Sequence, residues 1–160
     1  DILTYLQSLD PAIIHRDLKP RNIIRSESGQ IALVDFGAVG HTYHNTFMRG
    51  STVVGTFGYM APEQFRGQAY PATDLYSLGA TLLFLLTRRS PSELPVHKLA
   101  IQFQQQVNLS TAFTHWLETL LEPSLEKRFD SAQDAASALQ YRSLRRLRLQ
   151  LEQTPKKIWM

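Results

Sequence analysis

Cysteine is absent from the 160-residue sequence. A disulfide framework and thiolate metal ligands are therefore excluded, and the composition fits a reducing compartment. Long hydrophobic runs are also missing, because the longest apolar stretch, 75–86, is shorter than the roughly 20 residues that span a bilayer. The first residues show no basic segment, so we expect no signal peptide. We expect a cytoplasmic protein, or one at the cytoplasmic face of a membrane if a transmembrane segment follows Met160.

Positive charge is scarce except at the C-terminal end. Residues 141–160 hold six Lys and Arg against one Glu, a net of +5, whereas residues 1–140 carry a net of −2. The basic character belongs to this end of the chain and gives no support for nucleic-acid binding. We predict one domain over 1–140 and a basic tail or linker over 141–160. Contact between this tail and an anionic membrane surface is the alternative to a solvated linker.

The hydrophobic pattern predicts a mainly helical architecture. Residues 75–86 are apolar nearly all round, which is typical of a helix buried at the centre of a core. Asp74 directly before them is a good N-cap. Further helices are expected over 1–9 and 99–107, after a cap at Ser110 or Thr111, and from Asp130 onward.

Several polar residues surround a predicted β-hairpin. The short segments 23–25 and 31–34, which begin with apolar residues, are separated by five residues that include Gly29, a pattern typical of strand, turn and strand. Such a hairpin would bring Asn22 and Asp35, at its two outer ends, close together. Asp17 lies on a loop just before it.

These side chains form a set suited to phosphoryl transfer. Asp17 can accept a proton from a hydroxyl group, and Lys19 can neutralise a phosphate as a point charge. Asn22 and Asp35 offer the hard oxygen ligands that Mg²⁺ prefers. Phosphoryl transfer needs such a set because its catalysis depends on positioning and charge neutralisation.

Three motifs carry a resemblance to a known family. Residues 15–22 read His-Arg-Asp-Leu-Lys-Pro-Arg-Asn, residues 35–37 read Asp-Phe-Gly, and residues 61–63 read Ala-Pro-Glu. Their order and spacing resemble the C-terminal lobe of a eukaryotic-like Ser/Thr protein kinase, of a bacterial and cyanobacterial type. The resemblance covers about residues 1–140. It implies a mainly α lobe within the α+β kinase fold, helical with a small catalytic β-hairpin.

The resemblance also implies a role for each matching residue. Asp17 would be the catalytic base and Lys19 would contact the γ-phosphate of ATP. Asn22 and Asp35 would hold Mg²⁺. Thr56 would bridge Asp17 and Lys19 and help to select Ser or Thr in a protein substrate. The implied enzyme is a protein serine/threonine kinase that uses ATP and Mg²⁺.

Other residues are expected to regulate or support this site. Arg16 resembles the arginine of kinases that are controlled by phosphorylation of the activation loop, where a phosphate can pair with its guanidinium. Candidate acceptors are Thr42, Thr46, Ser51 and Thr52. Structural support is expected from His15, from a buried ion pair between Glu63 and Arg128, and from Asp74 as an N-cap or a tether of the catalytic loop.

The N-terminal lobe of the family has no counterpart here, because no G-x-G-x-x-G motif occurs in the sequence. The helical pattern at 1–9 begins without a cap, so we expect residues upstream. Two hypotheses stay open. The chain is the catalytic lobe of a kinase, or it is an inert kinase lobe that binds other proteins.

Overall fold

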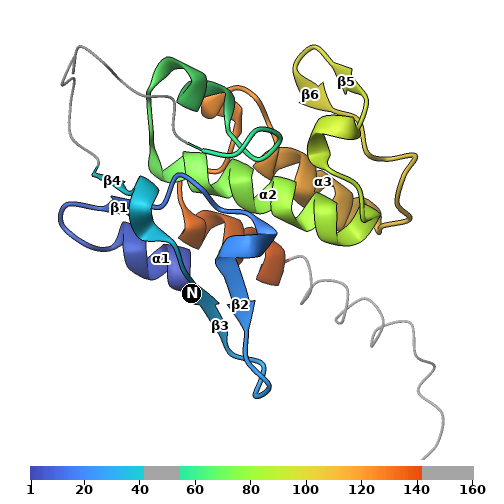
Figure 1. Ribbon diagram of the computed structural model, residues 1–160. Coiled ribbons are helices and arrows are strands. Elements are labelled where there is room, and N and C mark those ends of the chain that lie inside the picture. The colour runs from blue at the N-terminus through green and yellow to red at the C-terminus, as the bar shows by residue number, and fades with distance from the viewer. Residues whose placement is uncertain (42–54, 142–160) are drawn as a thin grey trace, which may run out of the picture.

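Helices form most of the regular structure in the computed structural model (Figure 1), which describes residues 1–41 and 55–141. The α-helices are α1 (Ile2–Gln7), α2 (Pro71–Thr87), α3 (Thr111–Leu120) and a helical segment at 132–141. Short 3-10 turns are η1 (Pro20–Asn22), η2 (Phe36–Ala38), η3 (Pro62–Arg66), η4 (Pro91–Glu93) and η5 (Leu125–Lys127). The predicted acceptors Thr42, Thr46, Ser51 and Thr52 and the tail 142–160 lie outside the described residues.

The strands pair as small antiparallel sheets of two strands each. Within the described residues these pairs are β1 (Ile13–Ile14) with β4 (Gly40–His41), β2 (Ile23–Arg25) with β3 (Ile31–Leu33), and β5 (Val96–His97) with β6 (Ala100–Ile101). The β2–β3 hairpin confirms the strand, turn and strand predicted at this position. The β1–β4 pair was not foreseen.

Helix α2 runs through the centre of the molecule and packs against α3 (Figure 1). Leu75 and Leu83 of α2 are buried in one core with Leu117 of α3. Complete burial of each such side chain contributes about 1.5–3 kcal/mol. Gly79 permits the close approach of the helices, since a Cβ there would lie 3.0 Å from the Leu121 side chain. The predicted central helix is confirmed. No helix of the described residues combines the length and the apolar character needed to cross a membrane.

The predicted start of this helix at Asp74 is wrong. Helix α2 begins at Pro71, and Tyr70 precedes it. Proline is favoured at the first helical position because its missing N–H would have no partner there. The hydroxyl of Thr73 accepts the Tyr70 N–H at 2.9 Å, which closes the first turn. Asp74 therefore lies inside the first turn, and its carboxylate is available for other contacts.

The predicted helix over 99–107 is also wrong, because a hairpin of β5 and β6 occupies the beginning of this segment. Lys98 and Leu99 form its two-residue turn with φ angles of 49° and 68°. Positive φ at both central residues matches the twist of a tight hairpin. Ile101 and Phe103 are buried on either side of the exposed Gln102. This burial follows the period of a strand, not that of a helix.

Each of the last two helices begins with a serine whose hydroxyl accepts a backbone N–H of the first turn. Ser110 caps α3 as predicted, because its Oγ accepts the Phe113 N–H at 3.3 Å. The final helical segment begins at residue 132, and Ser131 Oγ accepts the Asp134 N–H at 3.0 Å. The cap is thus Ser131, one residue after the predicted Asp130.

Helix α1 is too short to be stable by itself. Gln7 near its end anchors it, since Nε2 donates to the Pro71 carbonyl at 3.0 Å and Oε1 accepts the Ala132 N–H at 2.8 Å. This single side chain joins α1 to the first turn of α2 and to the helical segment 132–141.

Candidate active site

The β2–β3 hairpin positions the two residues predicted to bind a metal. Ile23 pairs with Leu33, and the Val34 N–H donates to the Asn22 carbonyl at 3.0 Å. Asn22 therefore lies beside the end of β3, and Asp35 follows one residue later. Asn22 is buried, whereas Asp35 is exposed and has a left-handed backbone with φ 63°. The hairpin brings its two outer ends together, as expected.

Asp17, Lys19 and Thr56 form a closed triangle of polar contacts. Lys19 Nζ lies 2.6 Å from Asp17 Oδ2 and donates to Thr56 Oγ1 at 2.8 Å. The Thr56 hydroxyl donates to Asp17 Oδ1 at 2.7 Å. Asn22 Nδ2 adds bonds to the Asp17 carbonyl at 2.9 Å and to Oδ2 at 3.3 Å. The side chains of Lys19 and Asp17 are 20% and 13% exposed, so a substrate can reach them.

Asp74 holds the backbone that leads into Asp17. Its Oδ2 accepts the His15 N–H at 2.7 Å, and its Oδ1 accepts the Arg16 N–H at 2.9 Å. From the other side, Gln64 Nε2 donates to the Arg16 carbonyl at 2.7 Å. Arg16 itself has a φ of 69°, a conformation that costs energy in a residue other than glycine. These contacts stabilise the strained turn and thereby fix the direction of Asp17.

The Asp74 contact predicts a measurable pH dependence. Burial raises the pKa of Asp74 from 3.8 to about 6, and the two N–H donors only partly offset this effect. The folded state thus keeps a proton between pH 4 and 6 that the unfolded state releases, so the free energy of unfolding falls as the pH rises through this window. The loss amounts to about 3 kcal/mol. We expect the Asp74→Asn variant to lack this contribution to the pH dependence. The free energy of unfolding is measured by urea denaturation at a series of pH values from 4 to 7.

The wild type and the Asp74→Asn variant have all their other carboxylates in common. The informative quantity is therefore the difference between the wild type and the Asp74→Asn variant at each pH. A constant difference between pH 4 and 7 would contradict the assignment.

His15 connects the catalytic loop to the Asp35 turn. The side chain is buried, and its Nε2 lies 3.1 Å from the Val34 carbonyl oxygen. Nδ1 accepts the Asp17 N–H at a nitrogen–nitrogen distance of 3.4 Å, which leaves Nε2 as the ring nitrogen that faces the Val34 carbonyl as a donor. The ring also packs at 4.8 Å from the Phe36 ring. These contacts give His15 a supporting position behind the site.

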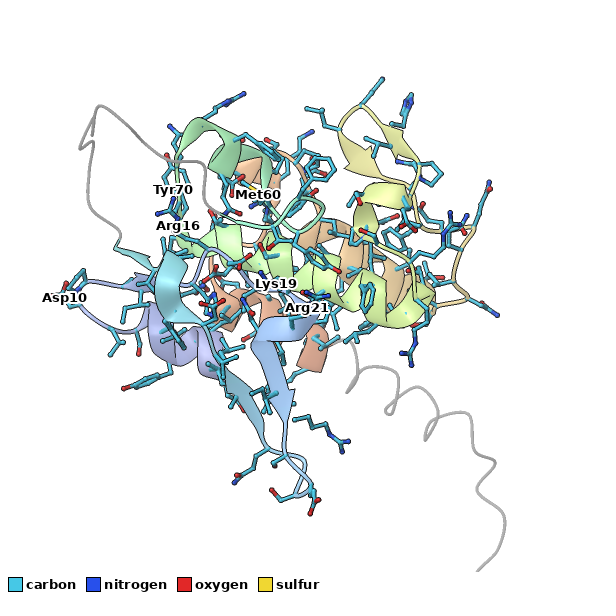
Figure 2. The ribbon with its side chains drawn as sticks, in the orientation of Figure 1. Asp10, Arg16, Lys19, Arg21, Met60 and Tyr70 are labelled. Atoms are coloured by element: carbon cyan, nitrogen blue, oxygen red, sulfur yellow. The ribbon has the colours of Figure 1, made fainter. Side chains whose placement is uncertain are left out.

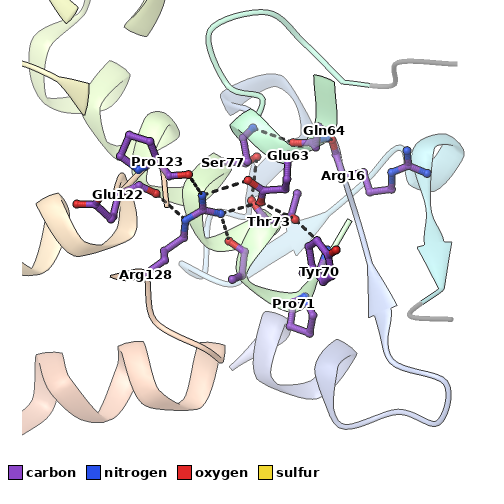
Figure 3. Close-up of polar contacts among 12 residues, drawn as sticks. Arg16, Glu63, Gln64, Tyr70, Pro71, Thr73, Ser77, Glu122, Pro123 and Arg128 are labelled. Carbon is purple, nitrogen blue, oxygen red and sulfur yellow. Dashed lines mark hydrogen bonds and ion pairs between the residues drawn. The ribbon is translucent and has the colours of Figure 1, made fainter. Parts of the chain in front are cut away.

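Glu63 and Arg128 form a buried ion pair (Figure 3). Arg128 donates to both carboxylate oxygens of Glu63, at 2.8 and 3.2 Å, and its side chain is fully buried. The same guanidinium donates to the carbonyls of Ala72, Glu122 and Pro123. The pair fastens η3 to α2 and to the loop before η5.

Two members of this network were missed in the sequence. Thr73 donates its hydroxyl to Glu63 Oε1 at 2.8 Å. Gln64 accepts the Ala61 N–H at 2.9 Å while it binds the Arg16 carbonyl. Both residues are fully buried. The only signal for Gln64 was its place directly after the Ala-Pro-Glu motif, and Thr73 gave none.

The donors present fit a magnesium ion that arrives with a phosphate. Within residues 1–41 and 55–141, no group of three or more His, Cys, Asp or Glu residues is placed to bind a metal. Mg²⁺ usually binds one or two protein oxygens and completes its shell with water and phosphates. Asn22 and Asp35 supply such oxygens. Because the Asn22 amide nitrogen is directed to Asp17, its oxygen is left for this role.

Comparison with known proteins assigns the family. Residues 2–143 match the family described as "Protein kinase domain". The chain therefore belongs to the protein kinase family, whose members are enzymes that generally use ATP and Mg²⁺. The helices and small antiparallel sheets are compatible with a part of that fold.

Relatives from cyanobacteria confirm the bacterial Ser/Thr kinase type. The chain is 33% identical over 150 residues to "Serine/threonine-protein kinase B" of Synechocystis sp., covering 87% of this chain and 26% of the relative. Identity to "Serine/threonine-protein kinase D" of the same organism is 38% over 146 residues, covering 86% and 28%. "Serine/threonine-protein kinase PknA" of Nostoc sp. is 36% identical over 148 residues, covering 87% and 26%. The chain spans about a quarter of the length of these relatives.

Proposed function

We propose that this chain is the C-terminal catalytic lobe of a serine/threonine protein kinase. The enzyme would transfer the γ-phosphoryl group of ATP to a Ser or Thr hydroxyl of a protein substrate. The observation that carries this proposal is the triangle of Asp17, Lys19 and Thr56. It places a carboxylate and an ammonium group together in an accessible position, and Asn22, a proposed metal ligand, is hydrogen-bonded to Asp17.

The geometry supports a division of labour in the transfer. Asp17 orients the substrate hydroxyl and accepts its proton as the oxygen attacks phosphorus. Lys19 neutralises charge on the phosphoryl group that is being transferred. Thr56, which is remote in sequence, binds the side chains of both Asp17 and Lys19, so neither side chain must reorient during the reaction. Asn22 and Asp35 would hold Mg²⁺, which supplies further charge neutralisation at the phosphates when it is bound.

An inert lobe that only binds proteins is the less favoured function. Docking through a surface does not require a lysine within 2.6 Å of a carboxylate and a threonine bridging both. Such contacts are needed where charge develops during a reaction.

Arg16 supports the proposal of control by phosphorylation. Its Nε is buried and has no hydrogen-bond partner among the described residues. A buried donor without a partner is costly, so an acceptor at this position would be stabilising. A phosphate on Thr42, Thr46, Ser51 or Thr52 is the acceptor that we propose.

The test of the proposed function is phosphotransfer by the complete gene product. Radiolabelled ATP is supplied with Mg²⁺ and with matched peptides whose acceptor is Ser, Thr or Tyr. Label should enter the Ser and Thr peptides and not the Tyr peptide, and chelation of Mg²⁺ should abolish transfer. Mg-ATP should also raise the Tm, because a ligand at 100 times its Kd stabilises by about 2.7 kcal/mol. Absence of both transfer and a Tm shift would overturn the proposal.

A further inference from the structure

The candidate active site is built from two segments of the chain. Residues 15–22 form the catalytic loop, and residues 55–66 carry Thr56 to it. Figure 2 shows Lys19 on the first segment and Met60 on the second. The distances within the triangle of polar contacts therefore depend on how these two segments are held against each other.

Gln64 bridges the two segments outside the triangle. Its side chain is completely buried. Nε2 donates to the Arg16 carbonyl at 2.7 Å (Figure 3), and Oε1 accepts the Ala61 N–H at 2.9 Å. Ala61 directly follows the turn in which the Met60 N–H donates to the Thr56 carbonyl at 3.2 Å. The donor and the acceptor of one amide thus bind different sides of the site.

The bond from Gln64 acts on the peptide unit that leads into Asp17. A peptide unit is planar, so its carbonyl and its N–H turn together. The Arg16 carbonyl accepts from Gln64, and the Asp17 N–H of the same unit donates to His15 Nδ1. Arg16, with a φ of 69°, has a strained conformation that its contacts must maintain. Loss of the Gln64 bond would let this unit rotate and turn the Asp17 carboxylate away from Thr56.

We propose that Gln64 positions Asp17 for phosphoryl transfer by holding the Arg16 carbonyl against the segment that carries Thr56. This inference rests on the proposed kinase function and adds to it a residue outside the triangle. Because Gln64 is completely buried, it acts through its two hydrogen bonds and not by contact with ATP or with the protein substrate. Its loss should therefore lower kcat and leave the binding of ATP unchanged.

Gln64→Met tests the bridge, because methionine has a similar volume and no amide. In the complete gene product, kcat for a Ser peptide at saturating Mg-ATP should fall about 30-fold, since a misplacement of about 1 Å can cost about a hundredfold. The KM for ATP should stay constant, because Asn22 and Asp35 are unaltered. For the same reason, Mg-ATP should raise the Tm of the variant as much as it raises that of the wild type.

Trp116→Phe is the control for a loss of stability alone. Trp116 is buried in the core that α2 and α3 share, and its Nε1 donates to the Ala135 carbonyl at 2.8 Å. The substitution removes a donor from a buried backbone carbonyl, as Gln64→Met does, and should lower the Tm by a similar amount. We expect wild-type kcat in Trp116→Phe. An equal loss of kcat in both variants would overturn the inference, because stability alone would then account for it.

Gln64→Glu separates the two hydrogen bonds of the amide. A carboxyl group can still accept the Ala61 N–H, but it donates to the Arg16 carbonyl only when it is protonated. Burial favours the protonated form, so kcat relative to the wild type should rise as the pH falls from about 8.5 to about 6. A relative kcat as low as that of Gln64→Met at every pH would contradict the inference. A relative kcat near that of the wild type throughout supports it, because the carboxyl group is then always a donor.

The outcomes separate the inference from the proposed function. Wild-type kcat in Gln64→Met overturns the inference and leaves the kinase function intact. A raised KM for ATP with unchanged kcat overturns it as well, because Gln64 would then support the nucleotide site. If Gln64→Met does not fold, the pH dependence of Gln64→Glu decides. A wild type without phosphotransfer overturns the function itself, and the inference with it.

Discussion

Asp17→Asn is expected to reduce kcat for peptide phosphorylation about a thousandfold, within the range that general bases contribute. An amide cannot accept the hydroxyl proton, and it carries no charge to hold Lys19. One oxygen of Asp17 now accepts from Thr56, and the other accepts from Lys19 and Asn22. In the variant, an NH₂ group must face one of these donors, so the triangle opens. Steady-state kinetics with saturating Mg-ATP measures the loss.

The effect should be confined to the chemical step. Binding of Mg-ATP, followed by the Tm shift, should survive in Asp17→Asn because the proposed metal ligands Asn22 and Asp35 are unaltered. Asp130→Asn is the matched control, since Asp130 is exposed and precedes the last helical segment, remote in sequence from the site. It should retain wild-type kcat. A kcat for Asp17→Asn within tenfold of the wild type would remove Asp17 from the role of base.

The position of the site could be predicted because its chemistry constrains the sequence locally. Asp17, Lys19 and Asn22 are close together in the chain, and a hairpin signal of five turn residues linked Asn22 to Asp35. Thr56 is different, since it joins the site from 39 residues beyond Asp17. Only the resemblance to a family suggested this contact, because no local sequence pattern encodes a contact between residues so far apart in the chain.

The two wrong helix predictions, a start at Asp74 and a helix over 99–107, have one physical cause. The local conformational preference of the residues competes with tertiary contacts. Asp74 has the residue type of an N-cap, and this preference favoured a helix start there. The carboxylate binds backbone N–H groups 58 and 59 residues away, which confirms the tether of the catalytic loop that the family resemblance implied. At 99–107 the apolar residues were compatible with either period, and burial of Ile101 and Phe103 decided for a strand. Neither the hydrogen bonds of Asp74 nor the burial of Ile101 and Phe103 can be predicted from a window of ten residues.

Arg128→Met is expected to reduce the free energy of unfolding by about 3–5 kcal/mol, the cost of breaking a buried ion pair from one side. The variant leaves the Glu63 carboxylate buried, with the Thr73 hydroxyl as its remaining described donor. It also removes the donors of the Ala72 and Glu122 carbonyls. Small domains have total stabilities of about 5–15 kcal/mol, so the loss is a large fraction. Urea denaturation followed by fluorescence measures it.

The reverse deletion should cost less, and this asymmetry is the sharper test. In Glu63→Gln, Arg128 keeps its backbone acceptors and can still donate to the amide oxygen at position 63. The double variant should be more stable than the sum of the single effects predicts, because it leaves no isolated charge. Lys127→Met is the control, since Lys127 is exposed and adjacent in the chain. A Glu63→Gln variant less stable than Arg128→Met would show that the carboxylate, and not the guanidinium, organises the contacts between η3 and α2.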